Sequence, residues 1–177
     1  EWLMILTFDP NMYLSEIVLV GCGGTGAQWA NGIARIIRMM QDTGKSTPHI
    51  KFIDPDIFER KNVGRQLVQD ASMGENKAIE LARRFNMALG LSIEAIPEAF
   101  DAKKHLLRRS GTVICGAVDN WKARQAISEA DNITWIDCGN SRFSGQVVIG
   151  TSADVEMMQS RMKSIESDTS TIRWLPN

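Results

Sequence analysis

A glycine-rich turn joins an apolar run to an amphipathic segment, and it constrains the fold of this chain more than any other feature. The stretch IVLVGCGGTGAQWANGI spans residues 17–33. The residues before the turn are almost wholly apolar and β-branched, which is typical of a buried strand. After the turn, apolar positions recur at helical spacing from about residue 25 to 40. The stretch therefore predicts a strand, a tight turn and a helix, in that order.

The spacing of the glycines indicates what this turn can bind. Gly21, Gly23 and Gly26 have the spacing G-x-G-x-x-G, and Gly24 adds a fourth glycine. Such glycines allow a tight turn, a close approach of backbone to phosphate, and the packing of helix against strand. The N-terminus of the helix adds free N–H groups and the positive end of its dipole. We therefore expect these four glycines to bind a phosphate-bearing ligand, although a buried turn without any ligand also favours glycine.

Strand and helix patterns alternate along the rest of the chain. This alternation predicts a doubly wound α/β fold, with a mostly parallel, Rossmann-like sheet covered by helices on both faces. In such sheets, ligands bind beyond the carboxyl ends of the strands, where the strand order reverses. Strands are expected at 16–20, 49–54, 91–97, 112–117, 133–138 and 145–150, and helices at 25–40, 75–89, 103–109 and 121–130.

Length and charge narrow the class of protein. The chain has 177 residues, 44% hydrophobic residues and a formal net charge of -1. This length suits one domain with a full core. The near-neutral charge argues against nucleic acid or an anionic membrane as the main partner, because both require a basic surplus. No signal peptide, membrane-spanning run or disulfide framework is visible, so we expect a cytoplasmic location.

Asp54, at the end of the second predicted strand, bears on the choice of nucleotide. A carboxylate here is placed to accept hydrogen bonds from ribose hydroxyls, as in an NAD(P)-dependent oxidoreductase. However, Asp54 lies further beyond the glycine turn than the roughly 20 residues usual for dinucleotide sites. The segment that follows, DPDIFERKNVGRQ, also carries more cations and amides than a dinucleotide requires. These two observations favour ATP, with the oxidoreductase as the alternative.

A triphosphate requires cations and usually a metal ion, because it is strongly negative. Arginine binds phosphate oxygens bidentately, lysine acts as a point charge, and a carboxylate at a strand end can hold Mg²⁺. Side chains of these types follow predicted strand ends or begin helices, and could converge over the turn: Asn62, Arg65, Gln66, Lys77 and Asp119. Taken singly, Arg65 and Lys77 could be solvated surface cations. Asp119 could instead cap the helix that begins near Trp121, and Asp56 fits a turn or cap better than a second ligand.

Five motifs occur in a characteristic order. They are VGCGGTG, IDPD, NVGRQ, GENKA and AVDNWKAR. Their order and spacing resemble those of the ThiF/MoeB and ubiquitin-activating enzyme family. The later DCGNSRFSGQVVIG also resembles the strand pair that follows the family's metal-binding aspartate. The match runs from about Ile17 to Gly150, and five motifs in order are far more specific than any one of them.

The resemblance implies an ATP-dependent adenylyltransferase. Such a nucleotidyltransferase joins AMP to the C-terminal carboxylate of a ubiquitin-like or sulfur-carrier protein, usually ending in Gly-Gly, and releases pyrophosphate. It implies that the glycine turn binds ATP and that Asp54 holds the ribose. By the same resemblance, Asn62, Arg65 and Lys77 contact the phosphates, Asp119 ligates Mg²⁺, and Gln66 and Arg124 support them. Of these, Arg65, Lys77 and Asp119 are the implied catalytic residues.

The resemblance also implies an organisation and a partner state. Residues 1–150 would form the ATP-binding adenylation domain, and residues 151–177 a C-terminal segment that the patterns do not place. These domains commonly pair, so we expect a homodimer.

The chain departs from the family in three ways. It lacks the two CxxC pairs that hold a structural zinc in many members, so no zinc is expected. Residues 1–16 contain no arginine, whereas members commonly carry one that reaches the partner subunit's site. Cys22, Cys115 and Cys138 do not match the later cysteine that forms a thioester. Adenylation alone is therefore expected, and a non-catalytic partner subunit that keeps the fold is a further alternative.

Overall fold

Strands and helices alternate along the part of the chain that the structure describes. The computed structural model describes residues 14–64, 66, 72–106, 111–131, 133–140 and 145–151. The predicted elements are present close to their expected bounds, except that β3 and α3 are shorter, and η1 was not expected. The elements are β1 (Glu16–Val20), α1 (Gly24–Asp42), β2 (His49–Ile53), η1 (Arg60–Asn62), α2 (Lys77–Leu89), β3 (Glu94–Ile96), α3 (Ala102–His105), β4 (Thr112–Gly116), α4 (Trp121–Ser128), β5 (Ile133–Asn140) and β6 (Gly145–Thr151).

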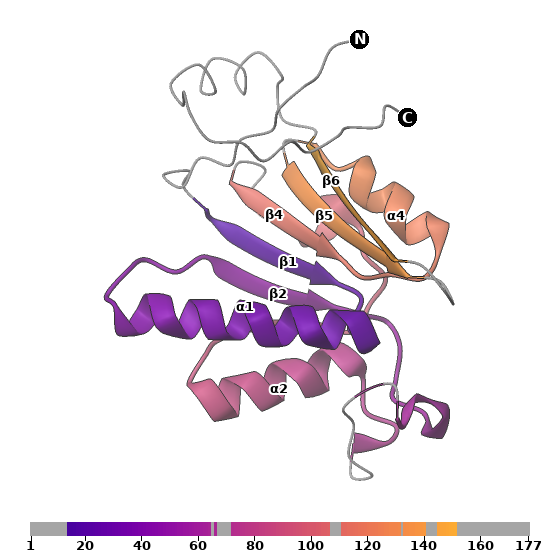
Figure 1. Cartoon of the computed structure of the whole chain (residues 1–177), viewed down its shortest axis with the longest axis horizontal. Coiled ribbons are helices and arrows are strands. Elements are labelled where there is room, and N and C mark those ends of the chain that lie inside the picture. Colours follow the sequence, from indigo (N-terminus) through magenta and orange to yellow (C-terminus); the bar gives the residue numbers. More distant parts are fainter. Residues whose placement is uncertain are drawn as a thin grey trace.

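One sheet contains the six described strands, in the order β3-β2-β1-β4-β5-β6 (Figure 1). Strands β1 to β5 are parallel to their neighbours, and β6 is antiparallel to β5. The strand order reverses between β1 and β4, which is where ligands bind in open sheets of this kind. The predicted doubly wound, mostly parallel α/β fold is confirmed.

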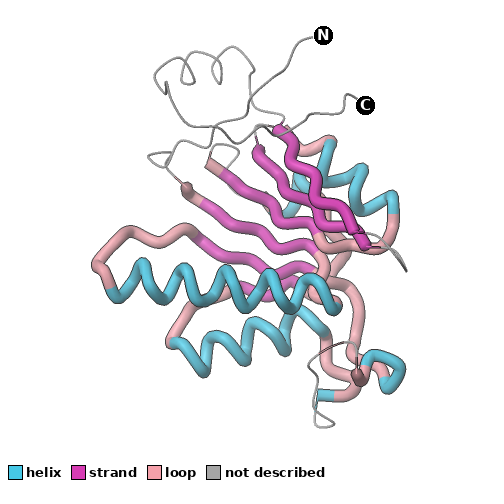
Figure 2. Tube along the Cα trace, viewed as in Figure 1, coloured by secondary structure: helices cyan, strands magenta, loops and turns pink. Residues whose placement is uncertain are grey.

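Helices cover both faces of this sheet. Figure 2 shows two long helices, α1 and α2, side by side along one face. Leu19 and Phe52 face these helices, whereas Val18 and Ile114 face the side of α3 and α4. Successive strand residues point to opposite faces, so a sheet covered on both sides requires continuous apolar strands. This burial explains the almost unbroken apolar sequence of β1.

Strand β3 is shorter than the expected 91–97 because the side chain of Asn86 forms hydrogen bonds with the backbone N–H and carbonyl of Ile93. The N–H of Ile93 donates to Oδ1 of Asn86, and Nδ2 of Asn86 donates to the Ile93 carbonyl. Ile93 is buried, but its backbone is therefore satisfied by α2 rather than by β2. Alternation of apolar residues alone does not reveal this competition.

Residues at the ends of α2 fix where that helix begins and stops. Asn76 precedes it, and its Oδ1 accepts hydrogen bonds from the N–H groups of Ala78 and Ile79. Gly90 ends it in the left-handed conformation, with φ of 65°. The cap at Asn76 places Lys77 at the first helical position, beside the end of β2.

Among the described helices, none has both the length and the hydropathy that a membrane crossing requires.

Candidate functional site

The N-terminus of α1 is free to accept a negatively charged group. Gly23 is the N-cap and offers no capping side chain, and the first turn has no acidic residue. The N–H of Ala27 donates to the Gly23 carbonyl, so the three preceding N–H groups of the helix have no acceptor within it. Free N–H groups and the helix dipole together attract an anion at this position.

Close packing explains why the turn requires glycine. A Cβ on Gly26 would lie 1.9 Å from the Gly21 carbonyl oxygen. A Cβ on Gly21, which has φ of +91°, would lie 2.6 Å from the carbonyl oxygen of Ala117. Gly26 therefore lets α1 approach β1, and Gly21 lets the turn after β4 lie against the glycine loop.

Asp54 ties the end of β2 to this loop. Its Oδ2 accepts a 2.6 Å hydrogen bond from the N–H of Cys22, and its Oδ1 accepts one of 2.8 Å from the N–H of Asp56. Burial raises the pKa of the Asp54 carboxyl, and the two N–H donors and Lys77 offset only part of that rise. A carboxylate has room for further donors, so these bonds leave Asp54 able to accept from a ribose.

Lys77 is a buried cation and not a solvated one, so the surface alternative for this residue is wrong. Its side chain is 9% exposed, and Nζ lies 2.9 Å from Oδ2 of Asp56, whose side chain is 67% exposed. Asp56 is thus an ion-pair partner of Lys77, a role that the turn-or-cap interpretation missed. Because Asp56 is largely solvated, this pairing is weak and leaves the Lys77 charge available to a phosphate.

Gln66 lies beside the glycine loop, and Asn62 supports it from η1. Nε2 of Gln66 is 3.7 Å from where a Cβ of Gly23 would stand. Its backbone N–H donates to the Asn62 carbonyl, while the buried Asn62 side chain accepts from the N–H of Glu59. Among the described residues, Gln66 Oε1 is buried and has no hydrogen-bond partner. A buried polar atom without a partner marks a position that a bound ligand could satisfy.

Asp119 lies in the exposed turn after β4. The start of this turn, at Ala117 and Val118, lies against Gly21. The alternative that Asp119 caps α4 is wrong, because Asn120 is the N-cap and its Oδ1 accepts from the N–H of Ala123. No hydrogen bond or ion pair engages the Asp119 carboxylate within the described part of the chain. That part also contains no group of three or more His, Cys, Asp or Glu side chains placed to hold a metal. A free carboxylate that shares its ion with phosphate oxygens fits the way in which proteins bind Mg²⁺.

The structure therefore brings Asp54, Asn62, Gln66 and Lys77 together at the glycine loop, with the Asp119 turn beside them. Their contact with a nucleotide stays a prediction. Arg65, the remaining candidate, lies outside the described residues, as do residues 152–177 of the C-terminal segment.

Arg124 and Asp137 form an ion pair whose acidic member sequence reasoning missed. Arg124 Nε lies 2.8 Å from Asp137 Oδ2. Asp137 faces Gly116 across β4 and β5, and this pairing depends on strand register. The only signal in the sequence is that a carboxylate, Asp137, directly follows the largely apolar run ITWI.

The cysteines behave as structural residues. Cys22 and Cys115 are buried, and burial raises the pKa of both thiols, that of Cys115 to about 12. Cys138 is half-buried, more open than its predicted buried strand suggested, and accepts a hydrogen bond from Trp29 Nε1 at 3.3 Å. The raised pKa keeps the Cys22 and Cys115 thiols protonated, and a protonated thiol is a poor nucleophile.

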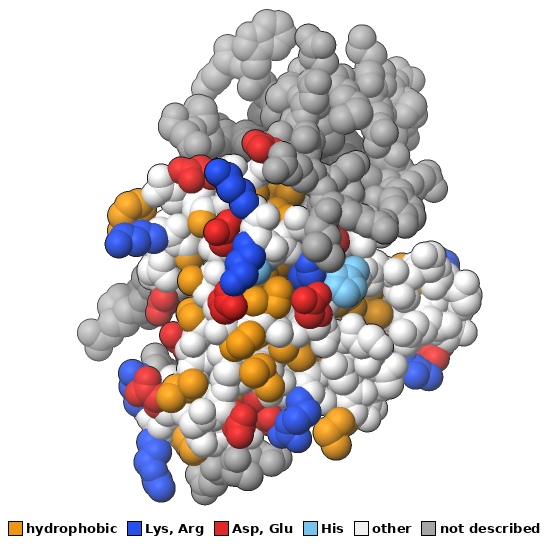
Figure 3. Space-filling model, turned by 180° about the vertical axis from the view of Figure 1, so that it is seen from behind, with side chains coloured by type: hydrophobic (Ala, Val, Ile, Leu, Met, Phe, Trp, Pro, Cys, Tyr) orange, Lys and Arg blue, Asp and Glu red, His pale blue; other side chains and the backbone are white. Residues whose placement is uncertain are grey.

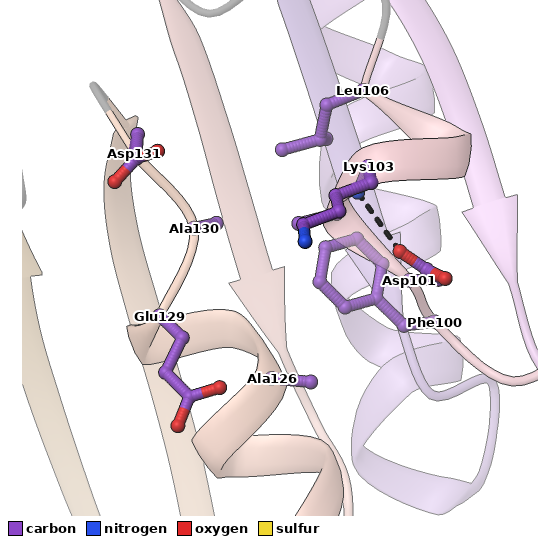
Figure 4. A pocket seen from close by; sticks show the side chains of 9 residues that line it. Phe100, Asp101, Lys103, Leu106, Ala126, Glu129, Ala130 and Asp131 are labelled. Atoms are coloured by element: carbon purple, nitrogen blue, oxygen red, sulfur yellow. Dashed lines mark hydrogen bonds between the residues drawn. The ribbon is translucent and has the colours of Figure 1, made fainter.

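A hollow of about 410 Å³ lies elsewhere, between α3 and α4 (Figure 4). Phe100 and Leu106 line it together with one cation, Lys103, and several acidic side chains. The Asp101 carboxylate there already accepts from the N–H of Lys103. This lining does not present the converging cations and N–H groups that a triphosphate requires, in contrast to the glycine loop.

Comparison with known proteins identifies the family of this chain. The family model described as the ThiF family matches residues 11–172, most of the chain. The chain belongs to the ThiF family. The search of curated proteins gave no match.

Three solved structures have a similar fold. E. coli MccB with ATP is 18% identical with a TM-score of 0.58, over 85% of this chain and 47% of MccB. PaaA is 24% identical with a TM-score of 0.57, over 80% of this chain and 43% of PaaA. E. coli TcdA, a tRNA N6-threonylcarbamoyladenosine dehydratase in complex with AMP, is 21% identical with a TM-score of 0.51, over 64% of this chain and 44% of TcdA. The chain thus spans less than half the length of each of these three structures.

Proposed function

We propose that this chain is an ATP-dependent adenylyltransferase, with residues 1–150 as its ATP-binding domain. The observation that carries the proposal is the convergence of free N–H groups of α1, the buried Lys77 and Asp54 at the carboxyl edge of the sheet. Membership of the ThiF family supports it. So do the nucleotides in similar structures: MccB was solved with ATP and TcdA with AMP.

The proposed reaction activates a carboxylate. An oxygen of the substrate carboxylate attacks the α-phosphorus of ATP, a new acyl–phosphate bond forms, and the bond to the β-phosphate breaks as pyrophosphate leaves. The N–H groups of α1 and the Lys77 ammonium would stabilise charge on the phosphates, and Asp54 would hold the ribose. Bound Mg²⁺, held by Asp119 and phosphate oxygens, would neutralise charge on the departing pyrophosphate.

The proposed substrate is the C-terminus of a ubiquitin-like or sulfur-carrier protein ending in Gly-Gly. Residues near the site along the chain support a polypeptide over a small acid, because Ile57, Val63 and Trp121, which closely follow Asp56, Asn62 and Asp119 in sequence, are large, exposed apolar side chains. Exposed apolar groups around a polar site are typical of protein contact surfaces. Of the similar structures, MccB was solved with AMPCPP and MccA.

Seen from behind relative to Figure 1, the described part of the surface mixes charges of both signs. On the face shown in Figure 3, blue and red side chains alternate among apolar ones. Nucleic acid binding requires a continuous basic surface, and the described side chains on this face do not form one.

Exchange of labelled pyrophosphate into ATP, with a candidate carrier protein present, tests the proposal. We expect Asp119→Ala and Arg65→Ala each to lower exchange by on the order of 10²-fold, because each removes charge stabilisation. Asp42→Ala is the control, since Asp42 is an exposed carboxylate that pairs with Arg38 at the far end of α1. Normal exchange in both site variants contradicts the assigned residues.

Two results separate this proposal from its alternatives. Tight NAD binding with no ATP binding indicates an oxidoreductase. ATP binding without exchange, when the correct carrier is present, indicates a non-catalytic subunit that keeps the fold.

A homodimer is part of the proposal. Val147 faces Cys138 across β5 and β6, so it lies on the same face of the sheet as α1, whose Trp29 donates to Cys138. Val147 is exposed there, as are Ile36 and Met39 on α1. Exposed apolar groups on one face of the sheet suit association with a second copy. Light scattering that gives the mass of a monomer at working concentration contradicts this part.

A further inference from the structure

Arg124 connects three segments at the carboxyl edge of the sheet. From α4, its Nε donates to Oδ2 of Asp137 on β5 at 2.8 Å. Its Nη2 donates to the carbonyl of Val118 at 2.7 Å. Val118 directly precedes Asp119, so the guanidinium holds the peptide group from which Asp119 extends.

Two glycines leave the space that this ion pair occupies. A Cβ on Gly116 would lie 2.6 Å from Asp137 Oδ1, and a Cβ on Gly139 would lie 3.1 Å from Arg124 Nη2. Side chains at either position would displace the pair. Asp137 Oδ1 is itself buried without a partner in the described part of the chain, so Arg124 is the main compensation for this carboxylate.

The glycine loop restrains the same turn from its other side. The N–H of Ala117 donates to the Val20 carbonyl at 2.8 Å, and the Ala117 carbonyl oxygen lies against Gly21. The turn from Ala117 to Asp119 is thus held between the glycine loop and Arg124. Loss of the hydrogen bond from Arg124 to Val118 would release the turn on the side of Arg124 only. Asp119, which follows Val118, lies nearest to that side.

We infer that Arg124 and Asp137 are positioning residues, which fix the Asp119 carboxylate relative to the glycine loop and so set the affinity for Mg²⁺-bound nucleotide. This inference rests on the proposed function, because it requires Asp119 to act on the metal–nucleotide complex. Neither residue is assigned a contact with the phosphates. If the pair served only to attach α4 to β5, its loss would act whether or not Asp119 was present.

A double-mutant cycle distinguishes these two roles. Arg124→Lys keeps a positive charge for the buried Asp137, but a single ammonium cannot reproduce the forked contact with both Asp137 and Val118. We expect Arg124→Lys to weaken ATP binding in the presence of Mg²⁺ by about tenfold when Asp119 is intact, and by less than about twofold in the Asp119→Asn background. Calorimetric titration of ATP with Mg²⁺, and again with EDTA, measures this coupling without relying on activity.

Controls keep the result interpretable. Arg38→Lys alters another arginine that forms an ion pair, in this case with Asp42. That pair lies at the end of α1 away from the glycine loop, so the variant is expected to leave ATP binding unchanged. Gly139→Ala presses on Arg124 Nη2 without removing a charge, and is expected to show the same dependence on Asp119 with a smaller effect. This second variant decides the matter if Arg124→Lys does not fold.

The outcomes separate the two proposals. If Arg124→Lys lowers the affinity for ATP equally with and without Asp119, the positioning role is overturned and the proposed function stands. Absence of any ATP binding by the unaltered protein overturns both. Loss that depends on Asp119 and on Mg²⁺ supports the inference.

Discussion

The backbone N–H of Cys22 donates a 2.6 Å hydrogen bond to the buried carboxylate of Asp54. This bond joins the glycine loop after β1 to the end of β2, so the group proposed to hold the ribose also shapes the phosphate-binding loop. A second donor, the N–H of Asp56, fixes the other oxygen. The orientation of Asp54 is therefore set by the protein before any nucleotide binds, which reduces the ordering required on binding.

Asp54 should make the stability of the protein depend on pH. Burial raises its pKa from the ordinary value of 3.8, so the folded state holds this proton more tightly than the unfolded state. As pH rises from the ordinary pKa towards the raised one, the unfolded chain releases the proton first, and the free energy of unfolding should fall. Asp54→Asn cannot titrate and should lose that part of the slope.

Urea unfolding at steps from about pH 4 to about pH 7 measures the slope. Asp42→Asn is the control, because Asp42 is exposed and pairs only with the partly exposed Arg38 among the described residues. Parallel curves for the unaltered protein and Asp54→Asn would show that Asp54 titrates normally.

The fold was predictable because hydrophobic periodicity reports directly on burial. Strands covered on both faces read as apolar runs, and α1 has its buried residues at helical spacing, including Ala30, Ile33 and Ile37. The carboxyl edge was predictable for a related reason, since parallel strands place their ends together. Asp54 follows β2 and Lys77 begins α2, close enough for the lysine charge to lower the pKa of the Asp54 carboxyl in part.

Features that depend on tertiary contacts were not predictable. The pairing of Asp137 with Arg124 depends on the register of β5, and that of Asp56 with Lys77 on the path of the segment between β2 and α2. Asp119 and Asn120 are adjacent and both suit an N-cap, so composition alone could not decide which one caps α4. Local propensity offers no means to separate such alternatives.

Removing the Lys77 charge should weaken nucleotide binding. Lys77→Met keeps most of the apolar stem and deletes the ammonium, so packing should survive. We expect ATP affinity to fall by about tenfold or more, because a cation beside phosphate in a buried site is weakly screened. Lys61→Met is the matched control, since the Lys61 side chain is 68% exposed and pairs with Glu59. A similar change in both variants, measured by calorimetry, argues that Lys77 acts only through net charge.

Two of the three thiols should resist alkylation in the folded protein. Burial raises the pKa of Cys115 to about 12, so its reactive thiolate is a minute fraction at about pH 8. Burial also raises the pKa of Cys22 well above its ordinary value. Mass spectrometry after treatment with iodoacetamide should show both unmodified until urea is added. Half-buried Cys138 should react first. Rapid native modification of Cys22 or Cys115 would contradict their structural role and reopen the question of a thioester.

Two glycines of α1 should respond to alanine in opposite directions. A Cβ on Gly26 would lie 1.9 Å from the Gly21 carbonyl oxygen, so Gly26→Ala must push the helix from the loop. We expect it to lower stability by at least about 1–3 kcal/mol and to abolish ATP binding. Gly32 is exposed in the middle of the same helix, with nothing within 4 Å of a Cβ, so Gly32→Ala should raise stability by about 0.5–1 kcal/mol and leave binding unchanged. Urea unfolding and calorimetry on both variants separate the effect of close packing at the loop from that of helix propensity. Equal effects of Gly26→Ala and Gly32→Ala would show that the close approach of α1 to Gly21 is not required.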